Sequence, residues 1–117
     1  MEQDLKLRTR SFAIRIVKLF VSLPKTTAAQ TVGKQLLRSG TSVGAHYRES
    51  QYAKSDADFV SKIQGALQEL EETIYWLELL EDMEIYERER LQPIHREADE
   101  LRAIFITIAK KVKARAA

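Results

Sequence analysis

The side chains that most often carry catalysis are sparse in this chain. Its 117 residues include no cysteine and only two histidines, His46 and His95. Neither histidine has a serine partner in a context that would suit nucleophilic catalysis. The sequence also contains none of the glycine-rich loops that hold the phosphates of nucleotides. We therefore expect no enzymatic activity, no cofactor and no small-molecule substrate.

Glutamates near the histidines raise the question of a metal centre. A di-metal carboxylate site in a helical bundle needs two Glu-x-x-His pairs and a glutamate from each of the other two helices. Here His46 and Glu49 form one pair in the reverse order, and His95 and Glu97 have the wrong spacing for one helix face. We therefore predict no metal site, although a metal-dependent enzyme is a third hypothesis that elemental analysis would test. The remaining glutamates are interpreted as a solvated face: Glu69, Glu71, Glu72 and Glu78.

Lysine and arginine are the other candidates for function, because they gather in particular parts of the chain. Residues 1–48 hold nine Lys/Arg and two acids, residues 49–100 hold five and fifteen, and residues 101–117 hold five and none. The net charges of the three segments are therefore +7, −10 and +5, in a chain of net charge +2. Basic and acidic helices could complement each other inside one bundle or between subunits. Alternatively, basic helix faces could meet the phosphates of a nucleic acid. The candidate nucleic-acid-binding residues are Arg8, Arg10, Arg15, Lys18, Lys25, Lys34, Arg38 and Arg48.

Four helical segments must position these side chains. Hydrophobic periodicity and punctuation predict helices over residues 4–23, 27–52, 56–83 and 87–113. Thr27 and Gln30 resemble a capping box, and Ser55 is a suitable N-cap for the third helix. Pro93 either kinks the last helix or marks its true start. Because the connections are short, sequence neighbours should lie antiparallel, which predicts an all-α, up-and-down four-helix bundle formed by residues 1–117 as a single domain.

Two of the helices carry more apolar surface than one buried stripe requires. Single stripes such as Phe12, Ile16 and Leu19 account for the core. Further apolar residues lie on other faces, where a monomer would expose them to water. They are either scattered surface residues or, as we favour, the interface of a homo-oligomer. These candidate interface residues are Ile14, Val17, Val21, Trp76, Leu79 and Met83.

The second helix contains Gly33, Gly40 and Gly44, each of which costs about 1 kcal/mol of helix stability relative to alanine. Such a cost predicts the close approach of another helix, or else a kink where serine and threonine hydroxyls flank Gly40. On the same helix, Arg38 and Glu49 share a face but stand three turns apart, so they cannot pair with each other. Each should form an ion pair with another helix or contact a ligand or RNA.

The start of the chain and its hydropathy indicate a cytoplasmic protein. The first six residues carry acids where a signal peptide would carry bases before an apolar run. No apolar stretch approaches the roughly 18–20 residues that span a bilayer. We therefore expect no contact with a membrane.

The segment that contains the glycines also resembles a known family. Residues 35–49 read QLLRSGTSVGAHYRE, which is similar to the signature of a bacterial four-helix bundle family whose founding members are encoded by intervening sequences in 23S ribosomal RNA genes. Residues 58–80 look like the third helix of that family. His46 departs from the family pattern, which commonly has asparagine there. The resemblance implies a four-helix bundle that assembles as a ring-like homopentamer and has no established enzymatic activity.

A related group, the accessory variability proteins of diversity-generating retroelements, is similar in fold. The resemblance implies that basic surfaces of such bundles bind nucleic acid and a reverse transcriptase. We therefore predict a non-enzymatic oligomer that associates with RNA, most directly ribosomal RNA, and reads shape more than sequence. The alternative is a protein–protein interaction scaffold with no nucleic-acid role.

Overall fold

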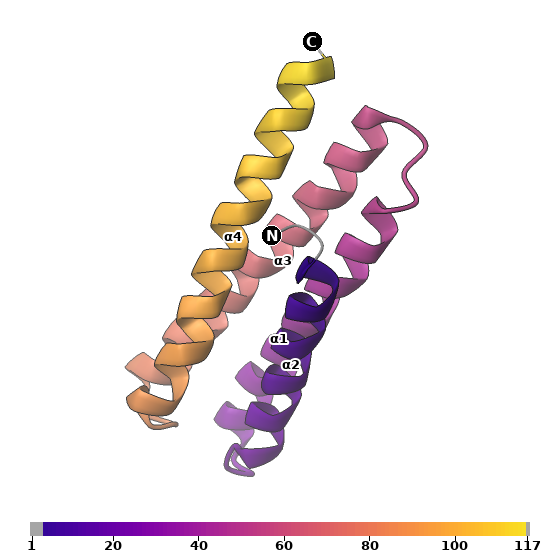
Figure 1. The fold of residues 1–117 in the computed structure, drawn as a ribbon. Helices are drawn as coiled ribbons and strands as arrows, with labels where there is room; N and C mark the ends of the chain where they lie inside the picture. Colours follow the sequence, from indigo (N-terminus) through magenta and orange to yellow (C-terminus); the bar gives the residue numbers. More distant parts are fainter. Residues whose placement is uncertain (1–3, 117) are drawn as a thin grey trace.

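The structure is a computed structural model, and it describes residues 4–116. These residues form four helices, namely α1 (Leu5–Ser22), α2 (Thr27–Ser50), α3 (Asp56–Asp82) and α4 (Arg88–Ala116). The helices run alternately up and down a bundle that measures 48 × 21 × 21 Å (Figure 1). No strand occurs in this described part of the chain. The predicted all-α, up-and-down four-helix bundle is confirmed.

The core lies along the bundle axis, because each helix turns one apolar stripe inward. α2 packs against α1 and α3, α3 packs against α4, and the neighbour of α1 on its other side is α4 rather than α3. With 18 residues α1 is much shorter than the 29-residue α4, which continues beyond it at the end where α2 passes into α3 (Figure 1). None of the described helices is both long and apolar enough to cross a membrane. The largest fully buried side chains include Phe12, Ile16, Leu36, Ile63, Leu70, Leu77, Leu101 and Phe105.

Side-chain caps begin the second and third helices. Ser55 is the N-cap of α3, as predicted, and its Oγ accepts a hydrogen bond of 3.1 Å from the backbone N–H of Asp58. The predicted capping box at the start of α2 is wrong by one residue. Thr26 is the N-cap and accepts from the N–H of Ala29, while the side chain of Gln30 donates to the carbonyl of Pro24. Consecutive threonines offer the same capping chemistry, so residue type alone does not distinguish them.

The connection between α3 and α4 depends on one residue in the left-handed region. Glu84 has a φ of 55°, and the N–H of Ile85 donates across it to the carbonyl of Leu80 at 3.1 Å. This six-residue hydrogen bond is the usual way to end a helix at a left-handed residue, a position that favours glycine. α4 then begins at Arg88 and runs through Pro93, so Pro93 does not mark its true start.

Helix α1 lies across the glycines of α2, which confirms the predicted close approach. A Cβ added at Gly40 would lie 2.8 Å from Ile16 Cγ1, and one at Gly44 would lie 3.1 Å from Thr9 Oγ1. α2 continues without interruption through this segment, and the hydroxyl of Thr41 donates to a carbonyl of the preceding turn. The glycines therefore allow α1 to approach α2 closely enough to bring their outer side chains together.

Candidate nucleic-acid interface

Arg8, the first of the predicted phosphate-binding residues, is engaged within the bundle. From α1 it donates two hydrogen bonds to Glu97 of α4, through Nε at 3.0 Å and through Nη2 at 2.7 Å, and Nη2 also contacts Glu100 at 3.1 Å. The hydrogen bond to Glu97 and the negative charges of both carboxylates raise the pKa of Arg8 above its usual value. This guanidinium is therefore occupied by protein carboxylates.

Arg38 is also paired, as the ion-pair alternative predicts. Its guanidinium reaches from α2 to two carboxylates of α3, lying 3.2 Å from Glu69 and hydrogen-bonding to Glu72. The hydrogen bond to Glu72 is the main cause that raises the pKa of Arg38. Glu49, by contrast, lies 3.8 Å from His46 of its own helix rather than beside another helix. Complementary charges within one bundle thus account for Arg8 and Arg38.

The other six predicted residues form no ion pair with any residue of the described part of the chain. The sequence explains why, because no acid occurs between Asp4 and Glu49 while nine Lys/Arg do. Of these nine cations, carboxylates of α3 and α4 reach only Arg8 and Arg38. The uncompensated cations are therefore Arg10, Arg15, Lys18, Lys25, Lys34 and Arg48.

Two of these six cations, together with Lys6, meet in a groove between α1 and α2. Lys6 and Arg10 stand one helical turn apart on the side of α1 that faces α2, and Arg48 approaches from α2. The floor between them consists of small residues, which keep the groove open. We call this volume of about 510 Å³ the α1–α2 groove, and it is lined by Lys6, Thr9, Arg10, Ala13, Thr41, Gly44, Ala45 and Arg48. No carboxylate is among these lining residues.

The groove continues past the end of α2 into a smaller pocket of about 320 Å³. This pocket shares Lys6 and Arg48 with the α1–α2 groove and adds Tyr47, Gln51 and Tyr52. Tyr47 is buried and stacks on a core phenylalanine at 5.8 Å, whereas Tyr52 is 87% exposed. Three cations and an exposed aromatic ring therefore lie along one continuous surface.

A second basic groove lies between α1 and α4 but is chemically mixed. Arg15 and Lys18 line it together with Arg90 and Tyr86. Arg90 stacks over the ring of Tyr86 at 4.8 Å and lies 3.7 Å from Glu87, so this third cation already has partners. The remaining predicted cations, Lys25 and Lys34, line neither groove.

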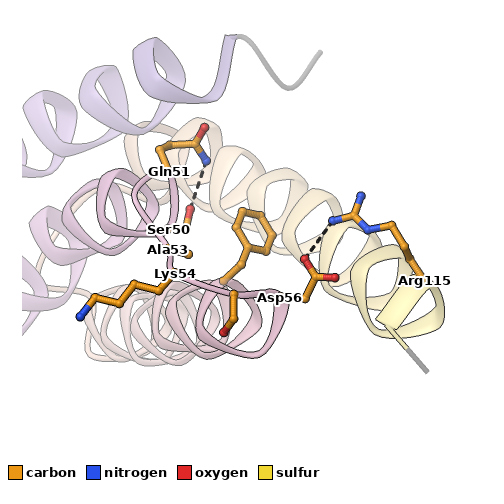
Figure 2. Close-up of a pocket in the computed structure, with 8 residues that line it drawn as sticks. Ser50, Gln51, Ala53, Lys54, Asp56 and Arg115 are labelled. Carbon is orange, nitrogen blue, oxygen red and sulfur yellow. Dashed lines mark hydrogen bonds and ion pairs between the residues drawn. The ribbon is translucent and has the colours of Figure 1, made fainter.

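The end of the bundle where α2 passes into α3 also holds a pocket of about 360 Å³ whose charged groups are largely satisfied (Figure 2). Arg115 reaches from the end of α4 to Asp56 at the start of α3, with Nη2 at 3.3 Å from Oδ1. Gln51 donates to Ser50 Oγ, and the side chain of Lys54 extends away from the pocket. The guanidinium that lines this pocket is therefore already paired, unlike the cations of the α1–α2 groove.

The match to a family model settles which family this sequence represents. Residues 2–107 match the model described as 23S rRNA-intervening sequence protein. The chain belongs to the 23S rRNA-intervening sequence protein family. A similar solved structure, determined at 1.70 Å, is that of a protein of unknown function from the S23 ribosomal protein family from Bacteroides thetaiotaomicron VPI-5482. The two chains are 42% identical with a TM-score of 0.85, over 91% of this chain and 98% of the other. None of the curated proteins compared matches this chain.

These comparisons confirm the family resemblance seen in residues 35–49. Neither description names a reaction, and that of the solved structure states that its function is unknown. Within residues 4–116 of this family member, no three His, Asp or Glu side chains are grouped so that they could hold a metal ion. The α1–α2 groove is therefore the feature on which a functional proposal can rest.

The predicted oligomer interface falls on two separate surfaces of this family member. Ile14, Val17 and Val21 are exposed on the outer face of α1, and Leu7, which was not predicted, extends the same stripe. Met83 is exposed at the C-cap of α3. Trp76 and Leu79 of α3 are partly buried against the core, and the indole N–H of Trp76 has no hydrogen-bond partner.

Sequence reasoning missed Lys6 and Tyr52 as site residues. Lys6 stands four residues before Arg10, a spacing that places both on one helical face, and this signal could have included it. Tyr52 follows the end of α2, and only the three-dimensional structure places it beside Lys6.

Proposed function

We propose that this family member binds RNA, with ribosomal RNA as the first ligand to test, and that it acts in the bacterial cytoplasm without catalysing a reaction. The observation that carries the proposal is the α1–α2 groove, where Lys6, Arg10 and Arg48 converge with no carboxylate among the lining residues. Clustered cations release counterions when they neutralise phosphates, which makes such binding favourable and dependent on salt. The family description, which names an intervening sequence of 23S rRNA, supports the choice of ligand.

The physical reason for choosing this groove is the difference between paired and free cations. Arg8 and Arg38 would have to leave carboxylates before meeting a phosphate, and each exchange would cost hydrogen bonds already made. Lys6, Arg10 and Arg48 are exposed and have no such partner within the described residues. They can therefore meet phosphates without first breaking interactions of the fold.

The test is the affinity of the purified protein for a labelled structured RNA, measured by fluorescence anisotropy at several salt concentrations. A variant that combines Lys6→Gln, Arg10→Gln and Arg48→Gln removes the groove's charge. A matched control removes the same charge from α4, where exposed basic residues lie away from the groove: Arg96→Gln, Lys110→Gln and Lys113→Gln. We expect the groove variant to bind much more weakly than the control. Equal loss in both variants would show that only total charge matters, and no binding by the wild-type protein at low salt would overturn the proposal.

A second proposal, that the protein is a ring-like homo-oligomer, rests on the two apolar surfaces. Leu7, Ile14 and Val21 recur every seven residues and form one exposed stripe on α1, while Tyr75 of α3 and Met83 at its C-cap are also exposed. α1 and α3 are not neighbouring helices of the bundle, so these two surfaces occupy opposite corners. Two different patches on opposite sides favour head-to-tail contacts, which close into a ring when the rotation between neighbouring subunits divides a full turn. The family resemblance suggests five subunits.

Charge supports the same head-to-tail contact. α3 carries eight acids and one lysine, whereas residues 5–48 carry nine bases and no acid. The acidic α3 of one subunit would therefore attract the basic α1 and α2 of the next.

Light scattering coupled to size exclusion should give an oligomer for the wild-type protein and a smaller species for Ile14→Glu with Val21→Glu. A wild-type monomer at high protein concentration would contradict this proposal, and a specific protein partner without RNA in pull-downs would favour the scaffold alternative.

A further inference from the structure

Tyr52 is the one tyrosine whose ring has no partner among residues 4–116. The chain has four tyrosines. Tyr47 stacks on Phe105, Tyr75 packs edge-on against Trp76 at 4.9 Å, and Tyr86 shares a hydrogen bond with Ser22. The backbone of Tyr52 is held at the end of α2, where its N–H donates to Glu49 at 3.1 Å. A ring that is 87% exposed is therefore presented on a fixed segment.

A single exposed aromatic side chain is common on protein surfaces and indicates nothing by itself. The surroundings of Tyr52 are what distinguish it, because the pocket that it lines also contains the side chains of Lys6 and Arg48. Those same two cations line the α1–α2 groove, where Arg10 lies one helical turn from Lys6. By helix geometry this turn corresponds to a rise of about 6 Å, which suits successive phosphates along an extended strand.

We propose that the α1–α2 groove holds an unpaired strand of nucleic acid, with phosphates at Lys6, Arg10 and Arg48 and one base stacked on Tyr52. The inference rests on the proposed RNA-binding function and specifies the form of RNA that this site accepts. Grooves that bind single strands combine cations that follow the backbone with aromatic rings on which bases stack. The lining residues of this groove and the adjoining pocket supply both components.

The same geometry disfavours a duplex at this site. Bases in a duplex are stacked on one another, so no base face is available to Tyr52 unless the strand is unpaired. Stacking on a tyrosine tolerates every base, so binding should depend little on sequence.

The test compares a short labelled single-stranded RNA with a duplex that contains the same strand. Binding of both is measured for the wild-type protein and for Tyr52→Ala and Tyr52→Phe. Loss of one stacked base should weaken single-strand binding by about 5- to 150-fold in Tyr52→Ala. Tyr52→Phe keeps the ring and should bind nearly as the wild type does, which makes it the matched control. Circular dichroism confirms that each variant keeps its helices.

The outcomes separate this inference from the proposed function. Preference for the single strand, with loss of single-strand affinity in Tyr52→Ala alone, supports both the single-strand inference and the proposed RNA binding. Salt-dependent binding that the groove variant abolishes, but that is equal for duplex and single strand or unchanged in Tyr52→Ala, overturns the inference and leaves RNA binding intact. Failure of the wild-type protein to bind either RNA at low salt overturns the single-strand inference and the proposed RNA binding together.

Discussion

Gly40 offers the sharpest test of how α1 and α2 pack. A Cβ added at this position would lie 2.8 Å from Ile16 Cγ1 and 2.9 Å from Ile16 Cγ2. Ile16 is fully buried, and its β-branched side chain has few alternative rotamers, so it cannot turn away. Gly40→Ala can therefore be accommodated only if α1 shifts away from α2.

Two opposing effects determine how much Gly40→Ala changes the free energy of unfolding. Alanine raises the helix stability of α2 by about 1 kcal/mol relative to glycine. Overpacking a close-packed interior typically costs about 1–3 kcal/mol. Because two branches of a rigid, buried side chain are overlapped at once, we place the steric cost near the top of that range. Gly40→Ala should therefore lower the free energy of unfolding by about 1–2 kcal/mol.

Urea denaturation followed by circular dichroism, at matched protein concentrations, measures this change. Gly44→Ala is the matched control, because its nearest contact is Thr9 Oγ1 at 3.1 Å and it should cost less than Gly40→Ala. The cost of Gly40→Ala should also fall in an Ile16→Leu background, where the branch moves away from the backbone. Stabilisation by Gly40→Ala, as helix propensity alone requires, would refute the close contact between α1 and α2.

Three further substitutions test local features of the fold by the same denaturation assay. Glu84→Gly should stabilise the protein by roughly 0.5–1 kcal/mol, because a left-handed φ of 55° suits glycine; destabilisation would argue against this helix ending. Ser55→Ala should cost about 1 kcal/mol through loss of the α3 N-cap, and no change would show that the cap is dispensable. Arg8→Gln should cost about 1 kcal/mol, since its pair with Glu97 is partly buried, yet leave RNA affinity nearly unchanged. Strong loss of RNA binding in Arg8→Gln would place phosphates on this paired residue instead.

Most of the fold is predictable from the sequence because local signals agree with one another. The stripe that contains Phe12 and Ile16 becomes buried core, and Ser55 begins a helix as its residue type and position indicate. The glycines of α2 predicted a close helix contact before the identity of the neighbour was known. The exact start of α2 was not predictable, because Thr26 and Thr27 are equally good caps by residue type.

The candidate site could be predicted only in part. Charge segregation identifies the first two helices as basic, but it cannot say which cations are free. Arg8 meets Glu97, which is 89 residues away, and Arg38 meets Glu69, which is 31 residues away. Such pairing depends on which helix faces meet across the bundle. The convergence of Lys6 and Arg48 likewise depends on the packing of α1 against α2, so no local pattern contains it.

The most direct test of RNA binding by the α1–α2 groove is the slope of log affinity against log salt for labelled RNA. Each phosphate contact contributes about 0.7–0.9 to this slope. The account predicts that removing the charges of Lys6, Arg10 and Arg48 reduces the magnitude of this negative slope by roughly 2–3, while the α4 control leaves the slope nearly unchanged. An unchanged slope in the groove variant, with wild-type protein still binding, would show that phosphates lie elsewhere and would contradict the account.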